Sequence, residues 1–126
     1  MAMDLVIEVD NEPGALARVA AAVSDAGVNL AAATCTNASD RAELHILVPH
    51  TEAVRHALAL TNLAITRERE VVVVEVDEDR PGVLADLTRT VAHAGVNLDL
   101  VYVATNNRVV LGSPDLAALK AALGHN

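Results

Sequence analysis

The sequence of 126 residues predicts an α+β fold made of two consecutive βαββαβ units, the second without its last strand. A Pro-Gly turn, a helical pattern and a closing glycine occur twice, with Gly14 and Gly27 in the first copy and Gly82 and Gly95 in the second. The glycines are 13 positions apart in both copies, and the copies are 68 positions apart. Similar strand patterns surround both copies, which indicates an internal repeat. We therefore expect two domains, residues 1–69 and 70–126.

The first unit begins with a strand over residues 5–9, which is rich in β-branched residues and places Leu5, Ile7 and Val9 on one face and Val6 and Glu8 on the other. Turn residues follow, and then Leu16, Val19, Ala20 and Val23 recur at the spacing of an amphipathic helix. Gly27 ends this helix, because glycine accepts the positive φ of a helix C-terminus.

The rest of the first unit predicts strands over residues 29–36 and 42–48 and a short fourth strand over residues 63–66. Between them Thr51 is a suitable N-cap for a second helix. The charged residues 67–70 are expected to form a solvated connector to the second unit.

The second half repeats the order of the first. Residues 71–76 predict a strand in which Glu75 matches Glu8 of the first unit. The further elements are a helix from Leu84 to Gly95, strands over 97–105 and 109–111 joined by Asn106-Asn107, and a helix from Pro114-Asp115. No residues are left for an eighth strand.

A βαββαβ unit with right-handed crossovers gives the ferredoxin-like arrangement, an antiparallel four-stranded sheet with two helices on one face. Units of about sixty residues are only marginally stable alone. We therefore expect the units to lean on one another or on a second chain, and a homodimer would cover exposed edge strands. Glu8 and Glu75 lie on the uncovered sheet faces, so we expect sheet edges or helix faces to make the contact.

Composition excludes several classes of function. The formal net charge is −8 and Tyr102 is the only aromatic residue, so direct binding to nucleic acid is not expected. No apolar run approaches the roughly 20 residues that span a bilayer, and no secretion signal is visible. The single cysteine, Cys35, agrees with a reducing compartment. We therefore expect a soluble cytoplasmic protein that does not bind membranes.

The repeated turn is the candidate binding site. It places unpaired backbone N–H groups at the start of a helix, at the positive end of its dipole. Gly14 and Gly82 have no Cβ, so a ligand carboxylate can approach the backbone closely. Asn11 stands beside the first turn and Asp79 and Arg80 beside the second, where they could recognise an amino acid.

A purely structural interpretation of the same residues remains open. Proline at the first helical position with Asn or Asp nearby is also the ordinary way to begin a helix. Asn29 and Asn97 each follow a helix-ending glycine and could simply bond backbone groups of the turn.

Residues 10–16 with 27–30 resemble the ACT domain, a small regulatory module that binds amino acids, and residues 78–84 with 95–98 resemble a second one. The resemblance covers nearly the whole chain and implies a stand-alone, non-catalytic tandem that senses an amino acid and regulates an enzyme partner or its own assembly. In the family, ligands bind at interfaces between ACT units, at the turn after the first strand and at the start of the second strand. Carried over, these positions are Asn11, Gly14, Ala15, Leu16 and Asn29 in the first copy and Asp79, Gly82, Val83, Leu84 and Asn97 in the second. The missing last strand leaves open which interface forms the pocket.

A metal-binding alternative rests on Cys35 and His45, which could be neighbours in a hairpin. Nickel-responsive repressors resemble ACT units and bind metal on such strands. The five histidines have no metal-ligand spacing, however, and a lone thiol in a strand is more often a small buried hydrophobe. We therefore expect no metal and no cofactor.

An enzymatic function is not expected. No nucleophile, base and orienting acid occur in a recognisable pattern, and no glycine-rich phosphate loop is present. Glu8, Glu75 and Asp99 lie on predicted strands, where solvated carboxylates are common. A purely structural interaction module stays as the third possibility.

Overall fold

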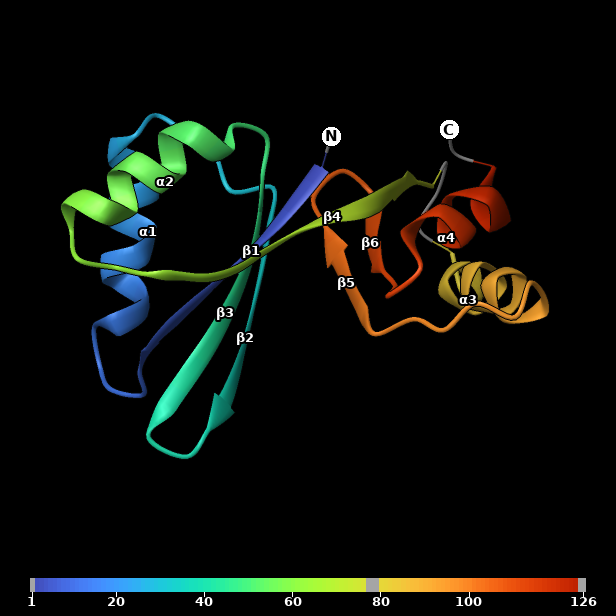
Figure 1. The fold of residues 1–126 in the computed structure, drawn as a ribbon, viewed down its shortest axis with the longest axis horizontal. Helices are drawn as coiled ribbons and strands as arrows, with labels where there is room; N and C mark the ends of the chain where they lie inside the picture. The colour runs from blue at the N-terminus through green and yellow to red at the C-terminus, as the bar shows by residue number, and fades with distance from the viewer. Residues whose placement is uncertain (1, 77–79, 125–126) are drawn as a thin grey trace. The chain divides into compact units, whose positions relative to one another are not determined.

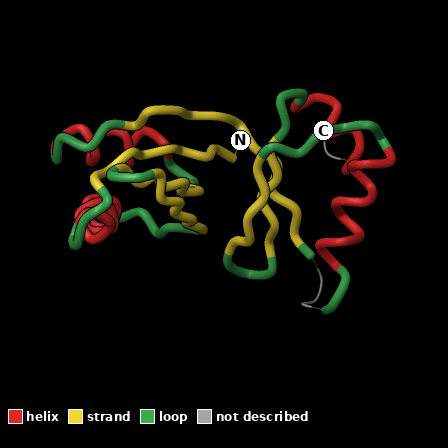
Figure 2. The backbone as a smooth tube through the Cα atoms, turned by 90° about the horizontal axis from the view of Figure 1, so that it is seen from below, coloured by secondary structure: helices red, strands yellow, loops and turns green. Residues whose placement is uncertain are grey.

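The computed structural model describes residues 2–76 and 80–124. The chain divides into two compact units, which we call the N-terminal unit, Ala2–Arg69, and the C-terminal unit, from Glu70 onward. In each unit two helices lie on one side of the strands (Figures 1 and 2). The expected α+β fold with two βαββαβ-type units in tandem is confirmed.

The elements follow the predicted order. The strands lie in the order β2-β3-β1-β4-β6-β5, and the described residues after the last helix add no further strand. The N-terminal unit contains β1 (Ala2–Asp10), α1 (Ala15–Asp25), β2 (Ala32–Ala38), β3 (Arg41–Val48), α2 (Thr51–Leu60) and the first part of β4 (Ile65–Glu75). The C-terminal unit contains the rest of β4, α3 (Val83–His93), β5 (Leu100–Ala104), β6 (Arg108–Gly112) and α4 (Leu116–Leu123).

Strand β4 corrects one prediction. Residues 67–70 were expected to be a connector between two strands, but Ile65–Glu75 is a single continuous strand. No glycine or proline interrupts it, and its charged side chains find partners on neighbouring elements. Glu68 accepts from Arg55 at 2.6 Å in the N-terminal unit, and Glu70 accepts from Lys120 at 2.7 Å in the C-terminal unit.

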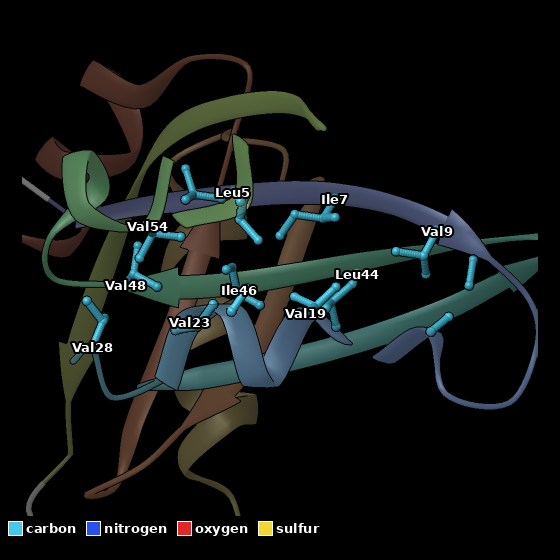
Figure 3. Packing of buried hydrophobic residues seen from close by; sticks show 14 residues of the cluster. Leu5, Ile7, Val9, Val19, Val23, Val28, Leu44, Ile46, Val48 and Val54 are labelled. Atoms are coloured by element: carbon cyan, nitrogen blue, oxygen red, sulfur yellow. The ribbon is translucent and has the colours of Figure 1, made fainter. Parts of the chain in front are cut away.

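The core of the N-terminal unit lies between its sheet and its helices (Figure 3). Leu5 and Ile7 of β1 point toward the helices and are fully buried. They pack in one cluster with Val19 of α1 and Val54 of α2. Burying one such side chain stabilises the fold by about 1.5–3 kcal/mol. The C-terminal unit has a smaller core of the same design, with Val72, Val91, Val109, Leu111 and Leu119.

Both long helices end as predicted. Gly27 and Gly95 adopt a φ of +74°, and the next residue donates back into the helix, from Val28 N to Val23 O and from Val96 N to Val91 O, each at 3.3 Å. The strands that follow, β2 from Ala32 and β5 from Leu100, begin three residues later than expected.

The hairpin turn and the last helix also agree with the sequence. Asn106 and Asn107 have φ values of +61° and +55°, the conformation for which asparagine is suited. Asp115 caps α4 by accepting from Ala118 N at 3.1 Å. The N-cap of α2 is His50 rather than Thr51, which is the first residue of the helix.

Candidate ligand-binding site

The two repeated turns have the same backbone geometry. Gly14 and Gly82 are the N-cap residues of α1 and α3, with φ values of +89° and +93°, and neither helix has a side-chain cap. A side chain at either position would be strained even though space is available, since L-residues disfavour this region. Glycine is therefore required by the backbone itself, not only by a ligand.

The first turn of α3 carries N–H groups close to the C-terminal turn. Val83 N donates to Arg80 O at 3.4 Å and Asp86 N to Gly82 O at 2.9 Å. Within residues 2–76 and 80–124, the N–H groups of Leu84 and Ala85 have no backbone acceptor outside the helix. Such groups at the positive end of a helix dipole attract an anion.

A cavity of about 320 Å³ lies at the C-terminal turn, between the start of α3 and the β5–β6 hairpin. It brings together four residues predicted from the sequence, Arg80, Gly82, Val83 and Leu84. The sequence did not predict the other residues of the lining, which are Val76 of the region before the turn, Ala85 of α3, and Val103, Ala104, Asn107, Arg108 and Val109 of the hairpin.

Two guanidinium groups line this cavity. Arg80 Nη2 lies 3.3 Å from Asp86 Oδ2, and its Nη1 would lie 3.9 Å from a methyl group placed on Gly82. Arg108 donates from Nε and Nη2 to Thr105 O and Oγ1 at 2.8 and 3.0 Å. No carboxylate occurs among the described lining residues, although Asp86 pairs with Arg80 from outside the lining, so the two arginines are donors suited to a negatively charged group.

The N-terminal turn is arranged differently. Asn11 Nδ2 donates to Asn37 Oδ1 at 3.0 Å and to Ser39 O at 3.2 Å, and Asn11 N donates to Asp40 O at 2.8 Å. These bonds tie the turn to the tip of the β2–β3 hairpin. Asn11 does not cap α1, whose N-cap is Gly14, and Pro13 precedes that N-cap, so the alternative interpretation of these residues as an ordinary helix start is wrong in both details.

The charges near the N-terminal turn do not favour an anion. Glu12 stands where the second copy has Arg80, and it lies 3.8 Å from Arg18. Arg41, on the adjacent strand, donates to Glu8 Oε1 at 2.9 Å and also to Asp10. The hydrogen bond to Glu8, with help from Asp10, raises the pKa of Arg41 above its ordinary value. This cation is already occupied by two carboxylates.

The remaining predicted residues do not join the two turns. Asn29 and Asn97 follow the far ends of α1 and α3, and an 11-residue helix is about 16 Å long. Asn97 lines a separate cavity of about 330 Å³. Ala15 is buried and Leu16 exposed, while Asp79 lies outside the described residues. A further cavity of about 310 Å³, between α1 and α2, contains none of the predicted residues.

The Cys35–His45 pair does not form a metal site. Cys35 is opposite Leu44, whose side chain lies in the core, and Thr34 is opposite His45, so the two side chains lie on opposite faces of the sheet. His45 instead contacts Asp4 Oδ2 through Nδ1 at 2.9 Å and Glu43 Oε1 through Nε2 at 3.0 Å. Among the residues that the structure describes, no three His, Cys, Asp or Glu side chains form a metal-binding group.

The Asp4–His45–Glu43 cluster was not predicted. Asp4 is fully buried and His45 is 7% exposed, on the sheet face away from the helices. Asp4 and His45 are 41 positions apart in sequence, and each is a polar residue with apolar residues on both sides, a weak signal in strands that carry other charged residues.

The profile of the ACT domain family matches residues 3–62 and 71–122. The chain therefore belongs to the ACT domain family, whose members are regulatory modules that bind amino acids. The two matched stretches correspond to the two repeats. No curated protein sequence matches the chain significantly.

Solved structures share this fold. The protein BT0572 from Bacteroides thetaiotaomicron aligns with a TM-score of 0.86 and 24% identity over 97% of this chain and 85% of that one. The regulatory subunit of aspartate kinase from Thermus thermophilus aligns with a TM-score of 0.66 and 21% identity over 98% and 90% of the two chains. The regulatory subunit of aspartate kinase from Thermus flavus aligns with a TM-score of 0.64 and 19% identity over 98% of this chain and 90% of that one. None of the helices that the structure describes is long and apolar enough to span a bilayer.

Proposed function

We propose that this chain is a non-catalytic sensor that binds an amino acid at the C-terminal turn and regulates an enzyme partner or its own assembly. The observation that supports this most is the cavity whose lining brings together Arg80, Gly82 and the first residues of α3. Membership of the ACT family supports the amino-acid class of ligand. We further propose that residues 1–69 and 70–126 act as two domains.

The chemistry of the cavity suits an amino acid. Arg80 and the N–H groups of Leu84 and Ala85 are donors for the α-carboxylate. Asn107, whose side chain has both a donor and an acceptor, lines the same cavity and is suited to an α-ammonium group. The described lining contains neither a nucleophile nor a base, so binding is the function that these residues support.

Assembly through strand β5 is part of the proposal. This strand lies at one end of the strand order, and none of its five residues is charged. Val101 and Val103 are 39% and 66% exposed, and natural edge strands usually carry charges or proline to prevent pairing. A second copy could pair antiparallel with β5 about a two-fold axis. We also assign the chain to the cytoplasm, since its one cysteine, Cys35, is exposed and unpaired.

Thermal unfolding of the full chain with each of the twenty amino acids tests the proposal. A ligand at 100 times its Kd adds about 2.7 kcal/mol of stability, which raises the melting temperature measurably. Light scattering on the same samples reports a change in assembly. If no amino acid shifts the melting temperature, the sensor function is wrong and a structural module is left.

Two charge reversals locate the site. Arg80→Glu gives the C-terminal turn the charge of the N-terminal one and should weaken binding at least about 100-fold. Glu12→Arg makes the opposite change at the N-terminal turn and should leave the affinity unchanged. Both side chains are exposed, so the fold should tolerate either variant. If Glu12→Arg changes the affinity and Arg80→Glu does not, the ligand binds at the N-terminal turn instead.

A further inference from the structure

We infer that the C-terminal cavity selects amino acids with a branched aliphatic side chain, such as valine, isoleucine or leucine. This inference rests on the proposed function and adds the class of ligand. The supporting observation is the distribution of polar and apolar residues within the cavity lining.

The apolar part of the lining comes from the bodies of β5 and β6 and from the start of α3. Val103 is paired with Val109, whose side chain belongs to the core beneath the helices, so both valines face the helix side of the sheet. Val103 is nevertheless 66% exposed, and Leu84 of α3 is 44% exposed. The cavity therefore has an apolar wall on which a ligand side chain can bury surface.

The polar part of the lining comes from the turn and from the hairpin. Arg80 and Gly82 belong to the turn, and Asn107 and Arg108 to the hairpin. When the carboxylate and ammonium groups of an amino acid take these partners, the side chain is left to face Val83, Val103 and Val109. A hydroxyl, amide or charged group there would lose water and gain no hydrogen bond from the apolar wall.

The N-terminal unit provides an internal contrast. The pairing of Cys35 with Leu44 corresponds to that of Val103 with Val109, so a thiol takes the place of the exposed valine. Arg80 corresponds to Glu12. The two units therefore differ in the charge beside the turn and in one exposed residue of the wall, Cys35 in place of Val103.

Calorimetric titration of the full chain with valine and with threonine tests the inference directly, because the two ligands have nearly the same shape. Valine should bind about ten-fold more tightly than threonine, and also about ten-fold more tightly than alanine, which lacks two buried methyl groups. Stronger binding of threonine, aspartate or lysine would overturn the inference and leave the sensor function intact. No binding by any amino acid would overturn both.

The exposed wall residue supplies a variant with a matched control. Val103→Ser should weaken valine binding about ten-fold and reduce the preference for valine over threonine. Cys35→Ser changes the corresponding surface position of the N-terminal unit and should leave the affinity for valine unchanged. If Val103→Ser binds valine as the parent chain does, the wall is not the specificity element and the inference is wrong.

Discussion

The N-terminal and C-terminal units share one backbone design but differ in chemistry at the same turn. Both turns have glycine at a φ near +90° and an uncapped helix start. The residue before the Pro-Gly pair is Glu12 in one unit and Arg80 in the other. The β2–β3 hairpin is three residues longer than the β5–β6 hairpin, counted from the corresponding pairs Cys35–Leu44 and Val103–Val109. The two units therefore share a backbone scaffold and differ in the charge beside the turn and in the length of the hairpin.

A second difference lies on the sheet face away from the helices. Here the N-terminal unit buries Asp4 and His45, and the strand registers place Val71 and Val110 at the corresponding positions. Glu43 corresponds to Arg108, a further charge reversal between the units. Since apolar residues occupy these positions in one repeat, the polar cluster of the other is not required by the fold.

The largest expected effect comes from replacing one residue of the buried polar cluster by its apolar counterpart from the C-terminal unit. His45→Val removes a partner of the fully buried Asp4, and we expect the free energy of unfolding to fall by about 3 kcal/mol. The double variant Asp4→Val with His45→Val should recover most of this loss. Urea unfolding measures both, and an unchanged stability of His45→Val would show that the buried cluster contributes nothing.

An intermediate effect tests the shared backbone of the two turns. Gly14→Ala and Gly82→Ala should each lower the stability by roughly 1–2 kcal/mol, because alanine disfavours the left-handed region. Only Gly82→Ala should also weaken amino-acid binding. Thermal unfolding with and without ligand separates the two effects, and equal loss of binding in both variants would contradict the assignment of the site to the C-terminal turn.

The smallest expected effect concerns the contact that ties the N-terminal turn to its hairpin. Asn11→Ala removes the bonds to Asn37 and Ser39 and should cost about 1 kcal/mol, because both partners are exposed to water. Affinity for the amino acid should not change. Urea unfolding and calorimetry check the two expectations, and a loss of affinity would give Asn11 a ligand-binding role after all.

The local chemistry of the chain predicted most of the fold. Gly27, Gly95, Asp115 and the Asn106-Asn107 turn act on their immediate neighbours, so the sequence alone identified the helix ends and the hairpin. Residues 67–70 were assigned wrongly because alternating charges are equally compatible with a loop and with a strand whose side chains find partners elsewhere.

The lining of the candidate cavity was predicted only in part, for a physical reason. Arg80, Gly82, Val83 and Leu84 lie within five consecutive residues, so one motif identified them together. Their counterparts across the cavity lie more than 15 positions later and depend on the register of β5 with β6. The Asp4–His45 contact depends likewise on the pairing of β1 with β3, which no local pattern specifies.

Strand β4 has a consequence for how this protein can be cut and synthesised. The boundary between the two units falls inside one strand, whose residues Arg67 and Arg69 are potential trypsin sites. Proteases cleave exposed loops much more readily than paired strands, so digestion should not release the two repeats as separate fragments. During translation the N-terminal repeat can complete its sheet as soon as β4 has left the ribosome, and the same strand is then the first of the C-terminal repeat to be available for pairing.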